Sequence, residues 1–262
     1  MKNRHLKRIA TSVAIALFAL ITLSAAYSGE EAMQAVYTRD SGNNMSANLI
    51  MTLTNSRGST RERSIQQFRQ TDADGEKKIM FFLAPSDVKD TSFLSYSYAD
   101  GRSDDQWIYL PALKRVKRVA SDKKNDSFMG SDFTYDDMGS RHPNEDTHTV
   151  LRTETLDGRK CLVVESIPKE AKPTYAKTIS WVVEGEWIGL KKEFYLPNGS
   201  LGKKLEIEAY EKIDGVWIIT DMKMSNVDKG SSTRIQMLDV TFNNDLKESV
   251  FTERQMKIGP RV

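Results

Sequence analysis

The stretch KKLEIEAYEKIDGVWIITDMKMSN, residues 203–226, holds two strand-like segments on either side of Asp214-Gly215. Gly and Asp tolerate the positive φ angles of a tight turn, so these segments are predicted to pair as an antiparallel hairpin. Similar turn signals recur along the chain, at Asp74-Gly75, Asp100-Gly101, Asp157-Gly158, Asn198-Gly199 and Asp228-Lys229-Gly230. Turns at this density predict an antiparallel meander.

Thirteen segments carry strand-like patterns, and a short helix is predicted over residues 30–38. The predicted strands are 47–54, 59–71, 77–84, 91–98, 106–110, 115–120, 148–156, 161–167, 176–183, 191–196, 203–213, 216–226 and 233–242. Helices do not alternate with strands, which argues against a parallel α/β sheet. No tandem repeat and no long Pro/Gly/Ser linker divides the chain, so residues 27–262 are predicted to form one domain.

Several predicted strands are apolar on both faces. In residues 78–83, Ile79, Phe81 and Leu83 alternate with Met80 and Phe82. Two further strands repeat the pattern, with Leu49, Met51 and Leu53 opposite Ile50, and with Trp107 and Tyr109 opposite Ile108. Such strands need cover on both sides, and the chain offers few helices. We therefore predict a mainly β fold, a curled antiparallel sheet with a partly filled interior.

The chain contains 11 methionines, of which only Met1 lies in the first 26 residues. Methionine is adaptable and often lines apolar binding sites, although it also fills gaps in ordinary cores. Both interpretations remain open from the sequence.

Residues 121–146 interrupt the meander with a polar, irregular stretch. A loop of that length within a compact domain is usually functional. It also carries five large apolar side chains: Phe128, Met129, Phe133, Tyr135 and Met138. We expect them either to plug the open end of the sheet or to form a lid.

Residues 1–26 have the pattern of a secretory signal peptide. Lys2, Arg4, Lys7 and Arg8 precede an apolar stretch over 9–23, and small residues follow at 24–26. An uncleaved anchor is the alternative, and no cysteine near the cut offers a site for a lipid anchor. We expect a soluble, exported protein in the periplasm.

Charge and cysteine content narrow the possible functions. Removing the four basic residues of the signal from the 38 Lys and Arg leaves 34, against 36 Asp and Glu. This balance gives no reason to expect nucleic-acid binding. Cys161 is the only cysteine, so the chain cannot form an internal disulfide, and its strand-like context predicts a buried side chain.

No pattern of an enzyme stands out. His142, Glu145, Asp146 and His148 match no zinc motif, and Pro143 argues against a helix there. A Gly-x-Ser-x-Gly motif, a phosphate-binding glycine loop and a Cys-x-x-Cys pair are all missing from the sequence. We therefore predict no catalytic residues, no metal and no cofactor.

Two kinds of charged cluster have simpler interpretations. Asp104-Asp105 and Asp136-Asp137 are expected in turns, caps or ion pairs. The basic residues 114–118 form either a solvated face or a contact with anionic lipid head groups or an acidic partner.

Several sequence runs resemble the outer-membrane lipoprotein-sorting (LolA-like) proteins. They are WIYLP (107–111), LKRVKR (113–118), SFMGSDFTYDDM (127–138), YAKTISWVV (175–183), KKEFY (191–195), VWII (216–219) and MSN (224–226). The resemblance spans about residues 30–258, and 127–138 is its most specific part. The resemblance implies that the curled antiparallel sheet forms a half-open β-barrel with short lid helices over an apolar cavity. It also implies a periplasmic carrier without catalysis. The family implies lipidated cargo, either lipoprotein acyl chains or a lipid, with an inner-membrane transporter of RND or ABC type and an outer-membrane acceptor as partners. The chain resembles members encoded beside RND-type exporters, which favours a lipid or lipid-like export substrate over a lipoprotein.

Strand alternation gives the candidate cavity and lid residues. They are Leu49, Met51, Leu53, Ile79, Phe81, Leu83, Trp107, Tyr109, Phe128, Met129, Phe133, Tyr135, Met138, Trp181 and Trp217. A shift of one residue would reverse the inward set of any strand. The competing hypotheses are a lipid or misfolded-protein sensor that works with a membrane protein, a periplasmic hydrolase, and a closed core without a cavity.

Overall fold

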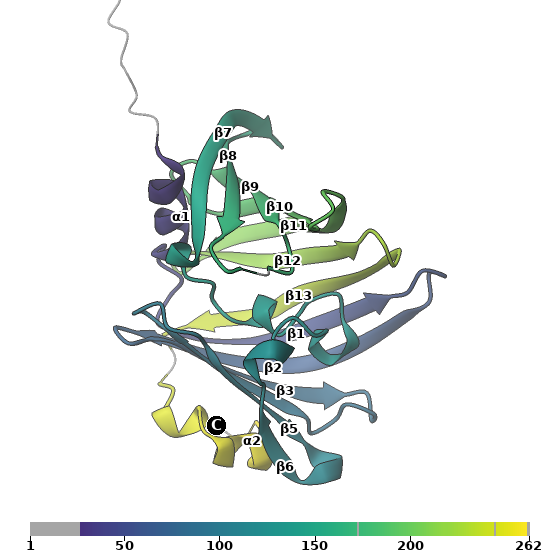
Figure 1. Ribbon diagram of the computed structural model, residues 1–262. Helices are drawn as coiled ribbons and strands as arrows, with labels where there is room; N and C mark the ends of the chain where they lie inside the picture. Colours follow the sequence, from purple (N-terminus) through teal and green to yellow (C-terminus); the bar gives the residue numbers. More distant parts are fainter. Residues whose placement is uncertain (1–26, 172, 244, 261–262) are drawn as a thin grey trace, which may run out of the picture.

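The computed structural model describes residues 27–171, 173–243 and 245–260. Residues 1–26 lie outside the described residues, so the signal peptide stays a prediction. The strands form one antiparallel sheet in the order β6-β5-β4-β3-β2-β1-β13-β12-β11-β10-β9-β8-β7 (Figure 1). In the described chain, the edge strands β6 and β7 do not pair with each other, so the curled sheet stays open, as predicted.

Every predicted strand is present, with bounds within three residues of those predicted. The strands are β1 (Asn44–Thr54), β2 (Thr60–Asp72), β3 (Gly75–Ala84), β4 (Ser92–Tyr98), β5 (Asp105–Leu110), β6 (Arg115–Arg118), β7 (Asp146–Leu156), β8 (Arg159–Pro168), β9 (Lys177–Val183), β10 (Gly189–Tyr195), β11 (Leu201–Ile213), β12 (Val216–Asn226) and β13 (Ser231–Phe242). The helices are α1 (Gly29–Tyr37), α2 (Glu253–Ile258) and the short 3-10 helices η1 (Pro111–Leu113), η2 (Ser121–Lys123), η3 (Phe128–Gly130), η4 (Asp136–Met138), η5 (Pro143–Glu145) and η6 (Glu248–Val250).

The hairpin turns form as their residues predict. Asp214 and Gly215 have φ angles of 49° and 85°, and Asp157 and Gly158 have 49° and 76°. Positive φ at both central residues is the geometry that matches the twist of the flanking strands.

The centre of the sheet joins distant parts of the chain. β1 pairs with β13, so that Leu49 lies opposite Met237 and Met51 opposite Ile235. Consequently β6 and β7, which are neighbours in sequence, lie at opposite edges of the sheet. The chain between them, residues 119–145, must cross the open side of the barrel (Figure 1), and we call it the crossing segment. It is less irregular than predicted, because η2, η3, η4 and η5 lie within it.

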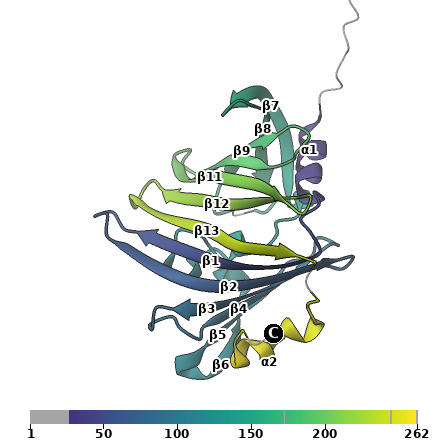
Figure 2. The same cartoon turned by 180° about the vertical axis from the view of Figure 1, so that it is seen from behind.

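Alternate residues of the strands enter separate cores. Met80 and Phe82 pack in the interior core with Phe128 of the crossing segment, whereas Ile79 and Phe81 pack with α2. Figure 2 shows α2 beside the strands from β3 to β6. The prediction that these strands need cover on both faces is therefore confirmed.

Helix α1 covers β7 and β8, and its predicted range is correct to within one residue. Ser28 and Glu31 form a reciprocal capping box that satisfies the first backbone N–H groups. A Cβ atom at Gly29 would lie 2.4 Å from the carbonyl oxygen of His148, so only glycine allows this close approach.

Candidate functional site

The crossing segment places its apolar side chains against the interior face of the sheet. Phe128, Phe133 and Met138 are buried there. The ring centroid of Phe128 lies 5.1 Å from that of Phe93 in β4 and 5.4 Å from that of Tyr135. Aromatic contacts of this kind add to the stabilisation from burial, so the segment is an integral part of the interior core.

Polar contacts hold the crossing segment to β11 and β13. The Asp132 carboxylate accepts hydrogen bonds from the Ser231 hydroxyl at 2.6 Å and the Thr233 hydroxyl at 2.8 Å. The Asp132 carbonyl accepts a hydrogen bond from Lys203 Nζ at 2.6 Å. Charge-assisted hydrogen bonds are stronger than neutral ones, and these fix the position of η3 over the sheet.

The other half of the sheet holds the segment as well. Gln106 Nε2 donates to the Tyr135 carbonyl at 2.8 Å, and the Ser140 N–H donates to Asp104 Oδ2 at 3.0 Å. The crossing segment is therefore tied to β5 and the turn before it as well as to β11 and β13.

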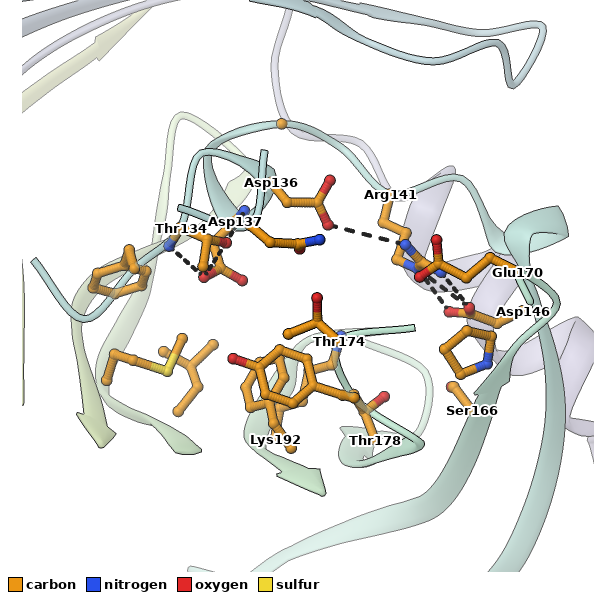
Figure 3. Close-up of a pocket in the computed structure, with 18 of the residues that line it drawn as sticks. Thr134, Asp136, Asp137, Arg141, Asp146, Ser166, Glu170, Thr174, Thr178 and Lys192 are labelled. Atoms are coloured by element: carbon orange, nitrogen blue, oxygen red, sulfur yellow. Dashed lines mark hydrogen bonds and ion pairs between the residues drawn. The ribbon is translucent and has the colours of Figure 1, made fainter. Parts of the chain in front are cut away.

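A cavity of about 280 Å³ lies between the crossing segment and strands β10, β11 and β12, and we call it cavity A (Figure 3). Its apolar wall consists of Phe133, Tyr175, Phe194, Leu205, Met222 and Met224. Its polar wall includes Thr134, Asp136, Asp137, Arg141, Asp146, Ser166, Glu170, Thr174, Thr178 and Lys192. One side therefore suits an apolar chain and the other suits a polar group.

A second cavity, cavity B, also has a volume of about 280 Å³. It adjoins cavity A, since Phe133, Asp137 and Met222 line both. Its apolar residues are Leu49, Met80, Met138, Ile218, Ile219, Ile235 and Met237. Each cavity is close to the lower end of the usual range for small-molecule sites, about 300–1,000 Å³. The two cavities lie side by side, with Phe133 and Met222 in the wall of both.

An ion-pair cluster closes one end of cavity A. Arg141 donates three hydrogen bonds to Asp146, from Nη2 to Oδ1 at 2.7 Å and from Nε to Oδ2 at 3.0 Å and to Oδ1 at 3.2 Å (Figure 3). Asp136 and Glu145 lie 3.9 and 3.5 Å from the same guanidinium. The hydrogen bonds to Asp146 raise the pKa of Arg141, whereas burial raises the pKa of Asp136 despite Arg141 nearby.

Lys192 lies in the wall shared by cavity A and a third cavity beneath α1. Burial lowers the pKa of its ammonium group, an effect that the nearby carboxylates of Asp137 and Asp146 oppose. The ammonium lies 5.2 Å from the ring centroid of Phe194. It is a positive charge at the border between the apolar and polar walls.

The structure brings together about half of the residues predicted to line a cavity. Those in the interior core are Leu49, Met51, Leu53, Phe128, Met129, Phe133, Tyr135 and Met138. Among them, Leu49, Phe133 and Met138 line cavity A or B.

The other predicted residues lie elsewhere. Ile79, Phe81, Trp107 and Tyr109 belong to the core under α2, and Trp181 and Trp217 belong to a core with Cys161. Leu83 is 37% exposed. For these strands the predicted residues share one face, but it is the face turned away from the cavities, because a period of two does not tell which face lies inside. In β3 the interior residues are Met80 and Phe82.

Sequence reasoning missed most of the residues that line cavity A. Arg141, Lys192, Phe194, Met222 and Met224 are among them. The high methionine content did indicate which residue type lines the interior. Five methionines line cavity A or B: Met80, Met138, Met222, Met224 and Met237. Composition did not tell which methionines line the cavities, since that depends on how β10 to β13 curl around the crossing segment.

Three expectations about single residues are confirmed. Cys161 is buried, and burial raises the pKa of its thiol. Asp137 has a turn role, accepting hydrogen bonds from the N–H and hydroxyl of Thr134 at 2.7 and 2.8 Å. Asp105 forms an ion pair with Arg118 in the edge strand β6.

His142 and His148 have structural partners. His142 accepts a hydrogen bond from the Asn144 N–H, and His148 bonds the Ser166 hydroxyl at 2.8 Å and the Pro143 carbonyl at 2.9 Å. Within the described ranges, no cluster of three or more His, Cys, Asp or Glu residues has the arrangement of a metal site. No helix of the described chain has the length and hydropathy needed to span a membrane.

Comparisons with known proteins agree with this architecture. The chain is 35% identical to an outer membrane lipoprotein-sorting protein domain from Vibrio parahaemolyticus, with a TM-score of 0.81 over 87% of this chain and 98% of that one. It is 28% identical to a DUF1329 family protein from Desulfovibrio piger, also with a TM-score of 0.81, over 87% of this chain and 97% of that one. A LolA superfamily protein from Nitrosomonas europaea shares the fold at 19% identity, with a TM-score of 0.68 over 88% of this chain and all of that one.

A family model described as "Uncharacterized protein" matches residues 74–258. A search of curated proteins finds no match. The half-open sheet over an apolar interior is the fold that this chain shares with the lipoprotein-sorting domain and with the LolA superfamily protein. The chain belongs to the same family as the outer membrane lipoprotein-sorting protein domain from Vibrio parahaemolyticus.

Proposed function

We propose that this protein carries lipidated cargo, a lipid or the acyl chains of a lipoprotein, through the periplasm between the inner and outer membranes. The observation that carries the proposal is the pair of adjoining cavities, lined by methionine and aromatic side chains, beneath the crossing segment. Burying an acyl chain gains about 0.8 kcal/mol for each CH₂ group. An apolar interior can therefore hold a chain that water would reject.

Such a carrier works by binding and release, without covalent chemistry. Loading requires a membrane protein that presents the cargo, for which an inner-membrane transporter of RND or ABC type is our candidate. Delivery requires an acceptor at the outer membrane. These partners and the periplasmic location rest on the family and on the predicted signal peptide.

The test is native mass spectrometry of the protein purified from the periplasm, followed by denaturation and lipid analysis of the released material. We expect bound lipid or acylated peptide in the wild type and its loss in Met222→Glu, which places a carboxylate in the wall of both cavities. Leu238→Glu is the matched control, because Leu238 is 47% exposed. A ligand-free mass, together with no uptake of a fluorescent fatty acid, would contradict the proposal.

A further inference from the structure

The cations around the interior cavities differ in how they are paired. Arg141 is paired with Asp146, and Lys78 lies 3.5 Å from Glu76. Arg69 lies 3.8 Å from Glu76, and Arg39 Nη1 donates to the Trp217 carbonyl at 2.6 Å. The ammonium group of Lys192 differs, since it has no hydrogen bond and no ion pair with any residue that the structure describes.

The nearest carboxylates are already engaged. Asp137 accepts two hydrogen bonds from Thr134, and both oxygens of Asp146 accept hydrogen bonds from Arg141. In Figure 3, Lys192 lies near Thr174 and Thr178, across cavity A from Asp136 and Asp137. Burying a charge without a partner is costly. A ligand that brings a negative charge to Lys192 would therefore offset the cost of removing its ammonium group from water.

The surroundings of Lys192 also limit the rest of the ligand. Phe194 of the same strand, Leu205 of the adjacent β11 and Met222 of β12 form the apolar wall of cavity A. Phe133 and Met222 also line cavity B, so the apolar walls of the two cavities adjoin. A molecule that fills this space has a charged end at Lys192 and an apolar tail in cavities A and B.

We propose that Lys192 binds the anionic head group of an acyl amphiphile, a carboxylate or a phosphate, whose tail lies in cavities A and B. This inference rests on the proposed lipid-binding function and narrows it, because a neutral acyl chain would leave Lys192 unpaired. Lys192 thus sets head-group specificity, while the apolar wall supplies affinity for the tail.

The test compares ligands with the same tail and different heads. Binding of oleate, oleoyl lysophosphatidylglycerol and the neutral oleyl alcohol would be measured on the mature protein by displacement of a fluorescent probe. We expect at least one anionic ligand to bind about tenfold or more tightly than oleyl alcohol, since hydrogen bonds to charged groups are among the strongest. Comparing oleate with the lysophospholipid tells whether a carboxylate or a phosphate is preferred.

The decisive variant is Lys192→Met, which keeps the length and apolar character of the side chain. It should abolish the preference for the anionic ligand over oleyl alcohol, whereas Lys192→Arg should retain that preference. Lys191→Met is the matched control, since Lys191 lies in the same strand and pairs with Glu193 at 2.6 Å.

The possible failures are distinguishable. Equal affinity of the wild type for all three ligands would overturn the role of Lys192 and leave lipid binding intact. Binding of none of them would overturn the proposed function itself. A preference that survives Lys192→Met in a folded protein would place the anionic group elsewhere.

Discussion

The two faces of this sheet are covered in different ways. On the outer face, η6 and α2 place Val250, Phe251 and Met256 directly on the apolar strand residues, and Phe251 and Met256 are each only 1% exposed. The Ser92 hydroxyl donates to the Met256 carbonyl at 2.9 Å, which ties α2 to β4. On the interior face, the crossing segment fills the centre and leaves cavities A and B on its sides.

The difference shows what makes a surface available to a ligand. Both faces derive from the same alternating strands, so their apolar character does not distinguish them. On the outer face, η6 and α2 pack their apolar side chains directly on the apolar strand residues. The interior is spanned by the crossing segment, which carries both polar and apolar groups. Tight packing stabilises the first, and incomplete packing gives the second room for an acyl chain.

The largest expected effect is on stability, from Phe251→Ala on the outer face. Truncation of a buried phenylalanine costs about 3–5 kcal/mol, and the free energy of unfolding from urea titration measures it. Phe133→Ala should cost less, because one side of Phe133 borders the cavities. Equal losses in the two variants would show that the interior is packed as tightly as the outer face.

Next in size is Asp132→Ala, which removes the hydrogen bonds from Ser231 and Thr233 to the crossing segment. We expect a loss of about 1–3 kcal/mol and faster hydrogen exchange at residues 127–138. Asp126→Ala provides the control, because Asp126 lies in the same segment and, among the described residues, its exposed carboxylate pairs only with Lys123, at 3.8 Å. If exchange does not change, the segment is held by its apolar contacts alone.

Lys192→Met is expected to change the free energy of unfolding by a smaller amount and to raise it, whereas the preceding variants lower it. Burial lowers the pKa of Lys192, with Asp136, Asp137 and Asp146 opposing and Arg141 adding to the shift. The folded state therefore binds the Lys192 proton less tightly than the unfolded chain does. Below the lowered pKa, where both states carry the proton, the charge lowers the free energy of unfolding by its full amount. At neutral pH the variant should be more stable by on the order of 1 kcal/mol.

The pH dependence of that difference is a further check. As the pH rises from the lowered pKa towards the ordinary lysine value of about 10.4, wild-type Lys192 loses its proton in the folded state and the advantage of Lys192→Met should shrink. Urea titrations at neutral and alkaline pH measure this directly. A constant difference would mean that Lys192 carries no desolvation penalty.

The smallest effect should come from Leu238→Glu, on an exposed position of the central strand β13. Exposed substitutions usually change stability by no more than about 0.5 kcal/mol, and lipid content should stay at the wild-type level. A large loss in either measurement would indicate that this position is covered, for instance by a binding partner.

Much of the fold was accessible from local signals. The turn residues Asp157-Gly158 and Asp214-Gly215 predicted their hairpins because few residue pairs adopt positive φ twice in succession. The candidate site was accessible only in part: Phe128, Phe133 and Met138 were found, because large apolar side chains in a polar loop need a covered position. Phe81 and Trp107 were assigned to the wrong face, since alternation alone does not tell which face lies inside.

The sequence by itself determined the strands, their hairpins and the need for cover on both faces, because these depend on neighbouring residues and on a period of two. Only the tertiary structure decided that β6 and β7 lie at opposite edges, so that residues 119–145 must cross the interior. That crossing brings Arg141 and Asp146 beside Lys192 of β10 and Met222 of β12. Contacts between such distant residues follow from how the sheet curls, which no local pattern in the chain records.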